Sequence, residues 1–251
     1  MFHQTIFLSV ALLASISQGL PSLSRKIQAR QGWVPSPPVI ISDVTPHDRY
    51  ASSIGVLGCK INTNRVAYWM EAIDCNNICL KLTHMASKRS VHLLKIDKSG
   101  AAHDISYDAW NYLKTGNPAK EGTAATGGPG DLGEVQYEYV DPDSPECKSL
   151  IYDPEGKLPL MGANSMNFFS SCPEGSWVKN NTQFWNLNDD RCSTGWNEKC
   201  TLLPGDNQPT CQPGHLLGYG GSEHPVLGPA DLKGDHKVVN IDYMTGKESA
   251  A

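Results

Sequence analysis

The sequence predicts a mainly β fold, a small barrel or sandwich with one short helix, followed by a disulfide-rich, irregular extension. Four short segments between residues 65 and 141 alternate apolar and polar side chains and are rich in β-forming residues. One segment, residues 106–116, has the pattern of a helix instead. From Lys148 onward Gly, Pro, Asn and Asp dominate, and four of the eight cysteines follow.

The predicted strands are the alternating segments. Side chains two positions apart share one face of a strand, so Leu80 and Leu82 point to the same side. The polar MASKR segment after His84 predicts a hairpin connection. In the extension, NSMNFFSSC and TQFWNL are the best strand candidates. The four strands predicted before the extension are RVAYW, ICLKLTH, SVHLLKID and EVQYEYVD, at residues 65–69, 78–84, 90–97 and 134–141.

The predicted helix is SYDAWNYLKTG. Ser106 is a favoured N-cap residue, and Gly116 suits the left-handed position that ends many helices. Trp110 and Leu113 are three positions apart, so both fall on one face. Asp108 stands in the first turn, where a negative charge complements the helix dipole.

The N-terminal residues predict export. Ile6–Ile16 is an uninterrupted apolar run with the length of a signal-peptide core, and it is too short to span a bilayer. We expect residues 1–19 to be a signal peptide and the protein to be extracellular or in a cell wall. Residues 20–50 are Pro-rich and fit either an exposed leader arm or a propeptide.

The cysteines agree with export. All eight lie after the predicted cleavage site, and an even number in an exported chain indicates disulfides rather than a zinc site. Asn180 begins an Asn-Asn-Thr glycosylation sequon. Nothing in the sequence calls for a metal or a cofactor. The cysteines are Cys59, Cys75, Cys79, Cys147, Cys172, Cys192, Cys200 and Cys211.

Net charge and hydropathy limit the classes of molecule that this protein could bind. A net charge of −5 and a pI near 5.9 argue against nucleic acid or an anionic membrane as the partner. No second apolar segment suggests a membrane anchor, and we expect a monomer. The chain then divides into a barrel at residues 51–147, a Cys-rich extension packed on it at 148–211, and a poorly ordered tail at 212–251.

Four motifs follow one another between residues 55 and 147, and their order and spacing are informative. They are CNNICLKLTH, SVHLLKID, GAAHDISYDAW and GEVQYEYVDPDSPEC. Together they resemble the barwin/expansin/rare-lipoprotein-A group of double-psi β-barrels. The resemblance implies a six-stranded barrel with a surface groove for polysaccharide. It also favours disulfides between Cys79 and Cys147 and between Cys59 and Cys75. That group's cysteine soon after the strand-end Asp is absent here.

The resemblance singles out two carboxylates. Asp104 takes the place of the Asp in that group's "DLS" element, and Asp97 that of the Asp ending the preceding strand. Asp104 could protonate a glycosidic oxygen, with Asp97 as a second carboxylate. The alternatives are structural: Asp104 complements the helix dipole, and Asp97 caps the DKSG turn.

Aromatic side chains could stack on sugar rings. Tyr68, Trp69, Tyr107 and Trp110 are the candidates, although the helical position of Trp110 predicts that it faces the core, and His103 could line the same groove. Because neighbouring strand residues point to opposite faces, only one of Tyr68 and Trp69 can face the groove. We favour Tyr68 or Tyr107.

The segment around Tyr68 faintly resembles the "TRYWD" element of endoglucanases that share this barrel. In those enzymes the catalytic base follows the aromatic pair, whereas Met70 follows it here and Glu71 comes one place later. A shift of one residue moves a side chain to the other face of the strand. We therefore expect an expansin-like or barwin-like protein that binds glucan, cellulose or chitin without hydrolase activity. The alternatives are a glycan-cleaving barrel with Asp104 as acid, and an effector or inhibitor that binds a protein.

Overall fold

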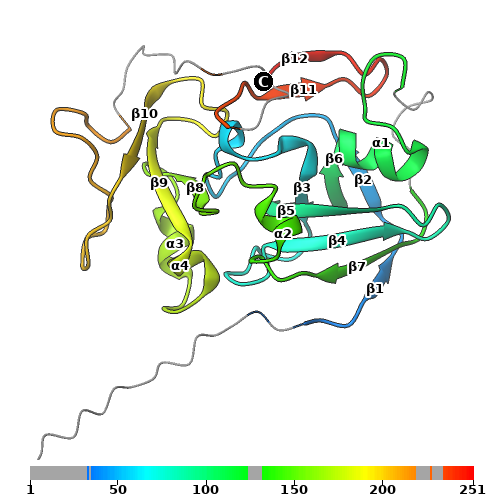
Figure 1. Cartoon of the computed structure of the whole chain (residues 1–251), viewed down its shortest axis with the longest axis horizontal. Coiled ribbons are helices and arrows are strands. Elements are labelled where there is room, and N and C mark those ends of the chain that lie inside the picture. Colours follow the sequence, from blue (N-terminus) through cyan, green and yellow to red (C-terminus); the bar gives the residue numbers. More distant parts are fainter. Residues whose placement is uncertain (1–32, 34, 124–131, 219–226, 228–233) are drawn as a thin grey trace, which may run out of the picture.

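The main feature of the fold is a curled seven-stranded sheet with a smaller three-stranded sheet beside it (Figure 1). It is seen in a computed structural model that describes residues 33, 35–123, 132–218, 227 and 234–251. The fold is mainly β, as predicted, and the large sheet curls into a half-barrel. The predicted signal peptide lies outside the described residues.

The large sheet has the strand order β1-β7-β4-β5-β3-β6-β2. Most neighbours are antiparallel, but the pairs β3/β5 and β2/β6 are parallel. The strands predicted at 65–69, 78–84, 90–97 and 134–141 are confirmed as β3, β4, β5 and β7. The strands are β1 (Val39–Ile41), β2 (Val44–His47), β3 (Val66–Trp69), β4 (Cys79–His84), β5 (Ser90–Lys98), β6 (His103–Ser106) and β7 (Val135–Tyr139).

The large sheet begins earlier in the chain than the sequence predicts. We expected an arm or propeptide up to residue 50, but β1 and β2 are the two edge strands of the large sheet. A proline within a segment argues against a strand, because it lacks the N–H group that a strand donates; Pro46 of β2 is such a residue. An edge strand tolerates this because only one of its sides is paired.

The predicted helix is confirmed as α1 (Tyr107–Thr115), which follows β6 without a loop. Gly116 ends it with φ of 88°, and its N–H donates to Tyr112 O at 2.8 Å. Trp110 and Leu113 are fully buried within the curl of the sheet, as their spacing predicts. Their core there also holds Trp69, Leu80, Leu82, Leu93, Ile105 and Val135.

The extension is more regular than expected. Its three strands form a sheet in the order β10-β9-β8, in which β8 and β9 are parallel. TQFWNL is confirmed as a strand. The prediction of a strand at NSMNFFSSC is wrong, since that segment is helical; a short apolar run does not distinguish a strand from a buried helix. The elements are α2 (Pro145–Lys148), β8 (Leu158–Met161), α3 (Met166–Ser171), α4 (Trp177–Asn180), β9 (Thr182–Leu187) and β10 (Gly195–Cys200).

A second core joins the extension to the large sheet. Leu94 and Ile96 of β5 share it with Leu160 of β8 and Phe184 of β9. Backbone bridges at Val56–Leu160 and Ile61–Ile151 reinforce the contact. The extension therefore packs against the large sheet, and Figure 1 shows β8, β9 and β10 beside it.

Residues 234–251, the last part of the tail that we expect to be poorly ordered, contain two strands and pack against the large sheet. Strands β11 (Val239–Ile241) and β12 (Glu248–Ala250) form a hairpin. Between them, the Tyr243 hydroxyl donates to Pro46 O at 2.7 Å and accepts from Asp48 N at 3.1 Å. These contacts are tertiary, so the Gly- and Pro-rich local sequence does not reveal them. Residues 219–226 and 228–233 lie outside the described part.

All eight cysteines form disulfides. The pairing Cys79–Cys147 is confirmed. The pairing of Cys59 with Cys75 is wrong, because each of the two bonds instead with a cysteine of the extension. The remaining bonds are Cys59–Cys192, Cys75–Cys172 and Cys200–Cys211.

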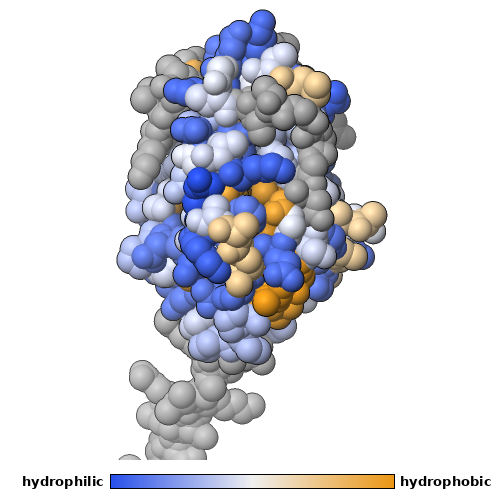
Figure 2. All heavy atoms as spheres, turned by 90° about the vertical axis from the view of Figure 1, so that its right-hand side faces the viewer, coloured by the Kyte–Doolittle hydropathy of each residue, from blue (hydrophilic) through white to orange (hydrophobic). Residues whose placement is uncertain are grey.

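The side of the molecule that carries α1 and the β4–β5 hairpin is mostly hydrophilic, with apolar residues gathered near its centre (Figure 2). Within the described residues, no helix has the length and apolar character to cross a membrane.

Candidate functional site

The fold brings the two candidate carboxylates into one row of the sheet. In the register of the strands, Tyr68 of β3 pairs with Asp97 on the β5 side and with Asp104 on the β6 side. Thr45 of β2 continues the row beyond Asp104. Two strand spacings separate the backbones of Asp97 and Asp104, roughly 9–10 Å.

Asp104 is half-buried, and both of its oxygens have hydrogen-bond partners. The hydroxyl of Thr45 donates to Oδ1, and the hydroxyl of Ser99 donates to Oδ2 at 2.8 Å. These bonds link β2, β6 and the turn after β5. The carboxylate therefore has at least a structural role, and the donors that hold it are neutral hydroxyls.

Asp97 fixes the loop that follows β2. Its Oδ2 accepts the Ser53 N–H at 2.5 Å, and its Oδ1 accepts the Ser53 hydroxyl at 2.5 Å. The N–H of Lys98 also donates to Oδ1, at 2.7 Å. This last bond joins neighbouring residues at the end of β5, so the capping of the DKSG turn by Asp97 stays a prediction.

Tyr68 is almost completely buried, with 5% of its surface exposed. Its hydroxyl donates to Arg49 O at 3.0 Å and accepts from Ala51 N at 3.3 Å. Burial raises the pKa of this hydroxyl well above its usual value, and the carboxylates of Asp97 and Asp104 raise it further. The group is thus a neutral hydrogen-bonding phenol.

The other predicted ligand-contacting residues lie in the interior. Tyr107 is 3% exposed, and its hydroxyl donates to Tyr243 O at 2.9 Å. Trp69 is fully buried between the rings of His103 and Tyr137, so its ring has no open face for a sugar. His103 is also buried, with Nδ1 3.0 Å from an Asp43 oxygen.

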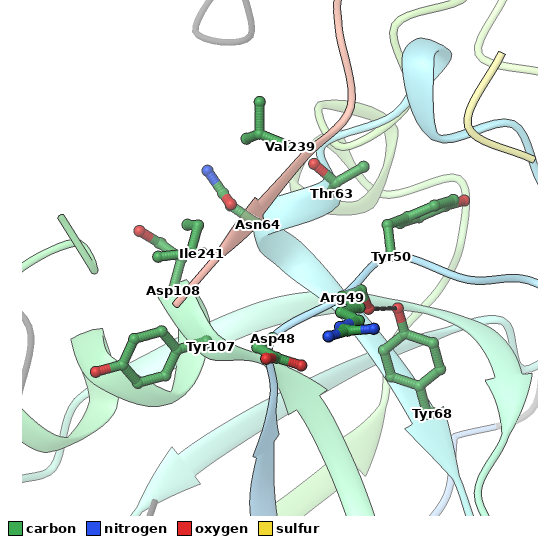
Figure 3. Close-up of a pocket in the computed structure, with 10 residues that line it drawn as sticks. All are labelled: Asp48, Arg49, Tyr50, Thr63, Asn64, Tyr68, Tyr107, Asp108, Val239 and Ile241. Carbon is green, nitrogen blue, oxygen red and sulfur yellow. Dashed lines mark hydrogen bonds between the residues drawn. The ribbon is translucent and has the colours of Figure 1, made fainter. Parts of the chain in front are cut away.

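Tyr68 and Tyr107 line the same small pocket (Figure 3). Its volume is about 20 Å³, which suits one water molecule rather than a sugar ring. The close-up shows the Tyr68 hydroxyl turned toward the backbone of Arg49. The two tyrosines preferred from the sequence therefore do not present a stacking surface in this conformation.

A larger groove opens beside Asp97. It encloses about 410 Å³, a volume in the range of ligand sites. One wall comes from the end of β5 and the Ser53 loop, and the other comes from α3 of the extension. We call it the Asp97 groove; it is lined by Ser53, Ile54, Ala72, Ile73, Asp97, Lys98, Asn164, Asn167, Phe168 and Ser171.

Our sequence reasoning missed the α3 wall of the Asp97 groove. Asn164, Asn167, Phe168 and Ser171 are spaced at i, i+3, i+4 and i+7, the spacing of one helix face, although Asn164 itself precedes the first turn of α3. That spacing was the available signal. It was overlooked because we interpreted the segment as a strand.

Asp190 is a second residue that the sequence did not single out. It follows β9, and its Oδ2 accepts the Ser52 N–H at 2.5 Å. Burial raises the pKa of its carboxyl group. Because Asp97 holds Ser53 and Asp190 holds the preceding residue, the two carboxylates fix the same loop from the half-barrel and from the extension.

Asn180 lies at the end of α4 with its side chain exposed, while Thr182 of the sequon begins β9. Glycosylation there stays a prediction. Across the described ranges, no cluster of three or more His, Cys, Asp or Glu side chains is placed to hold a metal ion.

Comparison with protein-family models, with curated proteins and with solved structures returns no match.

Proposed function

We propose that this chain is a secreted double-psi-barrel protein of the barwin/expansin type that binds cell-wall polysaccharide in the Asp97 groove without conventional hydrolysis. The observation that carries the proposal is the groove itself. It joins a predicted site residue, Asp97, to an exposed polar helix face, and its volume of about 410 Å³ can hold sugar units.

The lining of the groove suits a sugar chemically. A sugar ring has apolar C–H faces and a rim of hydroxyl groups. The partly exposed ring of Phe168 offers a flat apolar surface. The exposed amides of Asn164 and Asn167 and the carboxylate of Asp97 offer donors and acceptors for hydroxyls.

Three features of the fold support the family assignment. Two parallel strand pairs, β2/β6 and β3/β5, are linked by the antiparallel pair β3/β6, so the connections must cross over. Helix α1 follows β6 directly, as the HDIS motif implies. The Cys79–Cys147 bond matches the pair that the resemblance favours.

The positions of the acids argue against hydrolysis. An inverting glycosidase needs an acid and a base about 6.5–9.5 Å apart with water between them. Here the buried side chain of Tyr68 occupies the row between Asp97 and Asp104. The other candidate base, Glu71, lies 3.8 Å from His103, whose side chain points to the opposite face of β6 from Asp104.

The test is a binding assay with insoluble chitin, cellulose and β-glucan, in which depletion of the protein and release of reducing ends are measured together. We expect binding to at least one polymer without new reducing ends. Phe168→Ala should weaken binding about tenfold through loss of apolar contact area. Asn167→Ala should weaken it less, while Asn207→Ala, at an exposed site outside the groove, should not.

Two results would contradict the proposal. Reducing ends that appear with the wild type and disappear with Asp104→Asn would show a glycan-cleaving enzyme. Binding to none of the three polymers would favour an effector or inhibitor with a protein partner.

A further inference from the structure

Lys60 is a buried lysine that the proposed binding site does not use. It belongs to the single-turn 3-10 helix Gly58–Lys60 and is 2% exposed. Its Nζ lies 3.4 Å from the centre of the Trp185 ring. Lysine is almost never buried to this extent without partners, so its contacts need an explanation.

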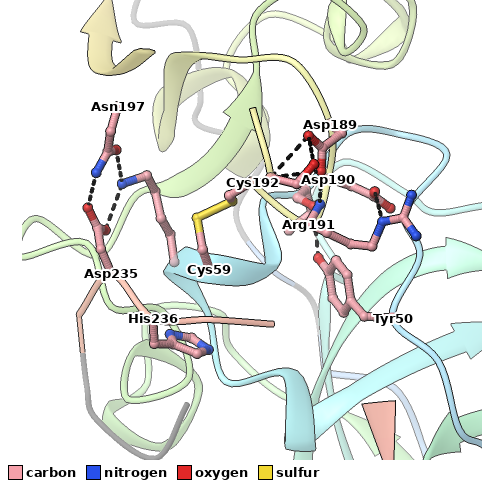
Figure 4. The surroundings of a disulfide bond; sticks show 12 residues. Tyr50, Cys59, Asp189, Asp190, Arg191, Cys192, Asn197, Asp235 and His236 are labelled. Atoms are coloured by element: carbon pink, nitrogen blue, oxygen red, sulfur yellow. Dashed lines mark hydrogen bonds and ion pairs between the residues drawn. A yellow bond between two sulfur atoms is a disulfide. The ribbon is translucent and has the colours of Figure 1, made fainter. Parts of the chain in front are cut away.

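The partners of Lys60 form a closed triangle. Its Nζ donates to Asn197 Oδ1 at 2.8 Å and to Asp235 Oδ1 at 2.7 Å. The third side of the triangle is a short hydrogen bond from Asn197 Nδ2 to Asp235 Oδ2. Figure 4 shows Asn197 and Asp235 facing each other near the Cys59–Cys192 disulfide. An amine, an amide and a carboxyl group therefore meet, and the carboxyl group contacts both nitrogens.

The surroundings of the triangle favour a reactive amine. Lys60 and Asp235 line a cavity of about 340 Å³ together with Tyr152, Pro154 and Trp185. Burial lowers the pKa of the Lys60 amine, although the hydrogen bond that the amine donates to Asp235 opposes this. A desolvated lysine amine in its neutral form is a good nucleophile.

We propose that Lys60 and Asn197 join in an intramolecular isopeptide bond, with Asp235 as the proton carrier. The protonated amine gives a proton to Asp235, and its lone pair then attacks Asn197 Cγ. The new Nζ–Cγ bond forms, and the bond from Cγ to Nδ2 breaks. Asp235 returns the proton to the leaving nitrogen, and the second amine proton follows it. The products are an amide and ammonium, so charge balances and no oxidant is needed.

The bond would join Asn197 of β10 to the Gly58–Lys60 turn and so give the extension a second covalent link to that turn. The first link is Cys59–Cys192, which reductants can open. An isopeptide bond at the adjacent residue would survive reduction and keep the extension joined to the half-barrel.

Lys95 provides an internal comparison. It is also buried, and burial lowers the pKa of its amine as well. Its nearest polar atoms are Tyr139 Oη at 3.5 Å and an Asp74 oxygen at 3.8 Å, with no asparagine amide among its polar partners. We therefore expect Lys95 to remain a free amine.

The experiment is peptide mapping of the secreted full-length protein after reduction, alkylation and trypsin digestion. Trypsin does not cut after an acylated lysine. The proposal predicts that peptide 50–65 is joined to peptide 192–199, with a mass lower by one ammonia than the two peptides together. Recovery of peptides 50–60 and 192–199 as separate linear species in the wild type would overturn it.

Two variants test the parts of the proposal. Asp235→Ala should yield only the linear peptides, and a joined peptide at the wild-type level would overturn the role of Asp235. On a denaturing gel under reducing conditions, the wild type should migrate faster than Lys60→Arg because the bond retains a closed loop. Equal mobility would contradict the bond. Since the wild-type digest decides the main question, the result does not depend on the variants folding.

Discussion

Asp108 joins three parts of the fold through one buried carboxylate. It lies in the first turn of α1, where the sequence predicts a charge that complements the helix dipole. In the structure, Oδ1 makes a short ion pair with Arg65 Nη1, and Oδ2 accepts the Ala119 N–H at 2.9 Å. Arg65 ends a 3-10 turn before β3, and Ala119 lies in the loop after α1. Asp108 therefore connects helix, turn and loop.

We predict that Asp108→Ala lowers the free energy of unfolding by about 3 kcal/mol, because it leaves Arg65 and a buried N–H without their partner. Urea unfolding measures this change. The control is Glu121→Ala, whose side chain is 73% exposed and lies 3.9 Å from Lys247. Exposed ion pairs add little, so the control should stay close to wild type.

A loss from Asp108→Ala of only about 0.3–1 kcal/mol would contradict this prediction. It would indicate that the residue acts through the helix dipole alone, as its position in the sequence suggests.

Among the elements, strand β10 contacts both β9 and the segment after Cys211 through one carboxylate, that of Glu198. Glu198 accepts from Asn186 Nδ2 of β9 at 2.9 Å and contacts His215 Nδ1 at 2.8 Å. Burial alone would raise the pKa of its carboxyl group, but these bonds and that of the Gln212 N–H outweigh burial and lower it. The ring of His215 stacks on Trp196 at 4.2 Å, so the same carboxylate positions the segment after Cys211.

We predict that acid weakens the contact between β10 and the segment around His215. A carboxyl group whose folded-state pKa is depressed contributes stability above its usual value, near pH 4.5, and loses it as pH falls through the folded-state value. The stability difference between the wild type and Glu198→Gln should therefore be largest near neutral pH and shrink below about pH 4. Urea unfolding at several pH values measures it, and a difference independent of pH would contradict the prediction.

The elements differ in how far the sequence determines them. Strands β3, β4, β5 and β7 follow local alternation, and helix α1 follows its apolar spacing and the Gly116 C-cap, so these could be predicted. The Ser106 side chain makes no capping hydrogen bond, contrary to the expectation for the start of α1. The edge strand β2 contains Pro46, so it is a strand only because β6 lies beside it. The α3 segment combines an apolar run, which also fits a strand, with a helical spacing of its polar residues, and the helix that forms follows the spacing.

At the scale of the whole molecule, the candidate site depends on long-range pairing. The row of Asp97, Tyr68 and Asp104 arises because β3 lies between β5 and β6, and a strand order of this kind is not encoded locally. The Asp97 groove further requires α3 to pack against the end of β5. Residue identity could suggest Asp97 and Asp104, but only the fold shows that Trp69 is buried and that α3 supplies a wall.

Three of the disulfides are nested, and this has a consequence for how the chain folds. Cys79–Cys147 lies within the loop closed by Cys75–Cys172, which lies within that of Cys59–Cys192. Their separations are 68, 97 and 133 residues. Once the inner bond exists, the next bond closes only the difference of 29 residues, and the outermost then closes 36. Shorter loops cost less entropy to close, so oxidation should proceed from the inside outward.

We predict that acid-trapped intermediates of oxidative refolding, identified by peptide mapping, contain Cys79–Cys147 before Cys59–Cys192. The separate Cys200–Cys211 loop spans 11 residues and should close early on its own. Early accumulation of a species with Cys59–Cys192 alone would contradict this order. With the expected order, the half-barrel forms its own bond first. The extension then docks on a half-barrel that is already covalently closed.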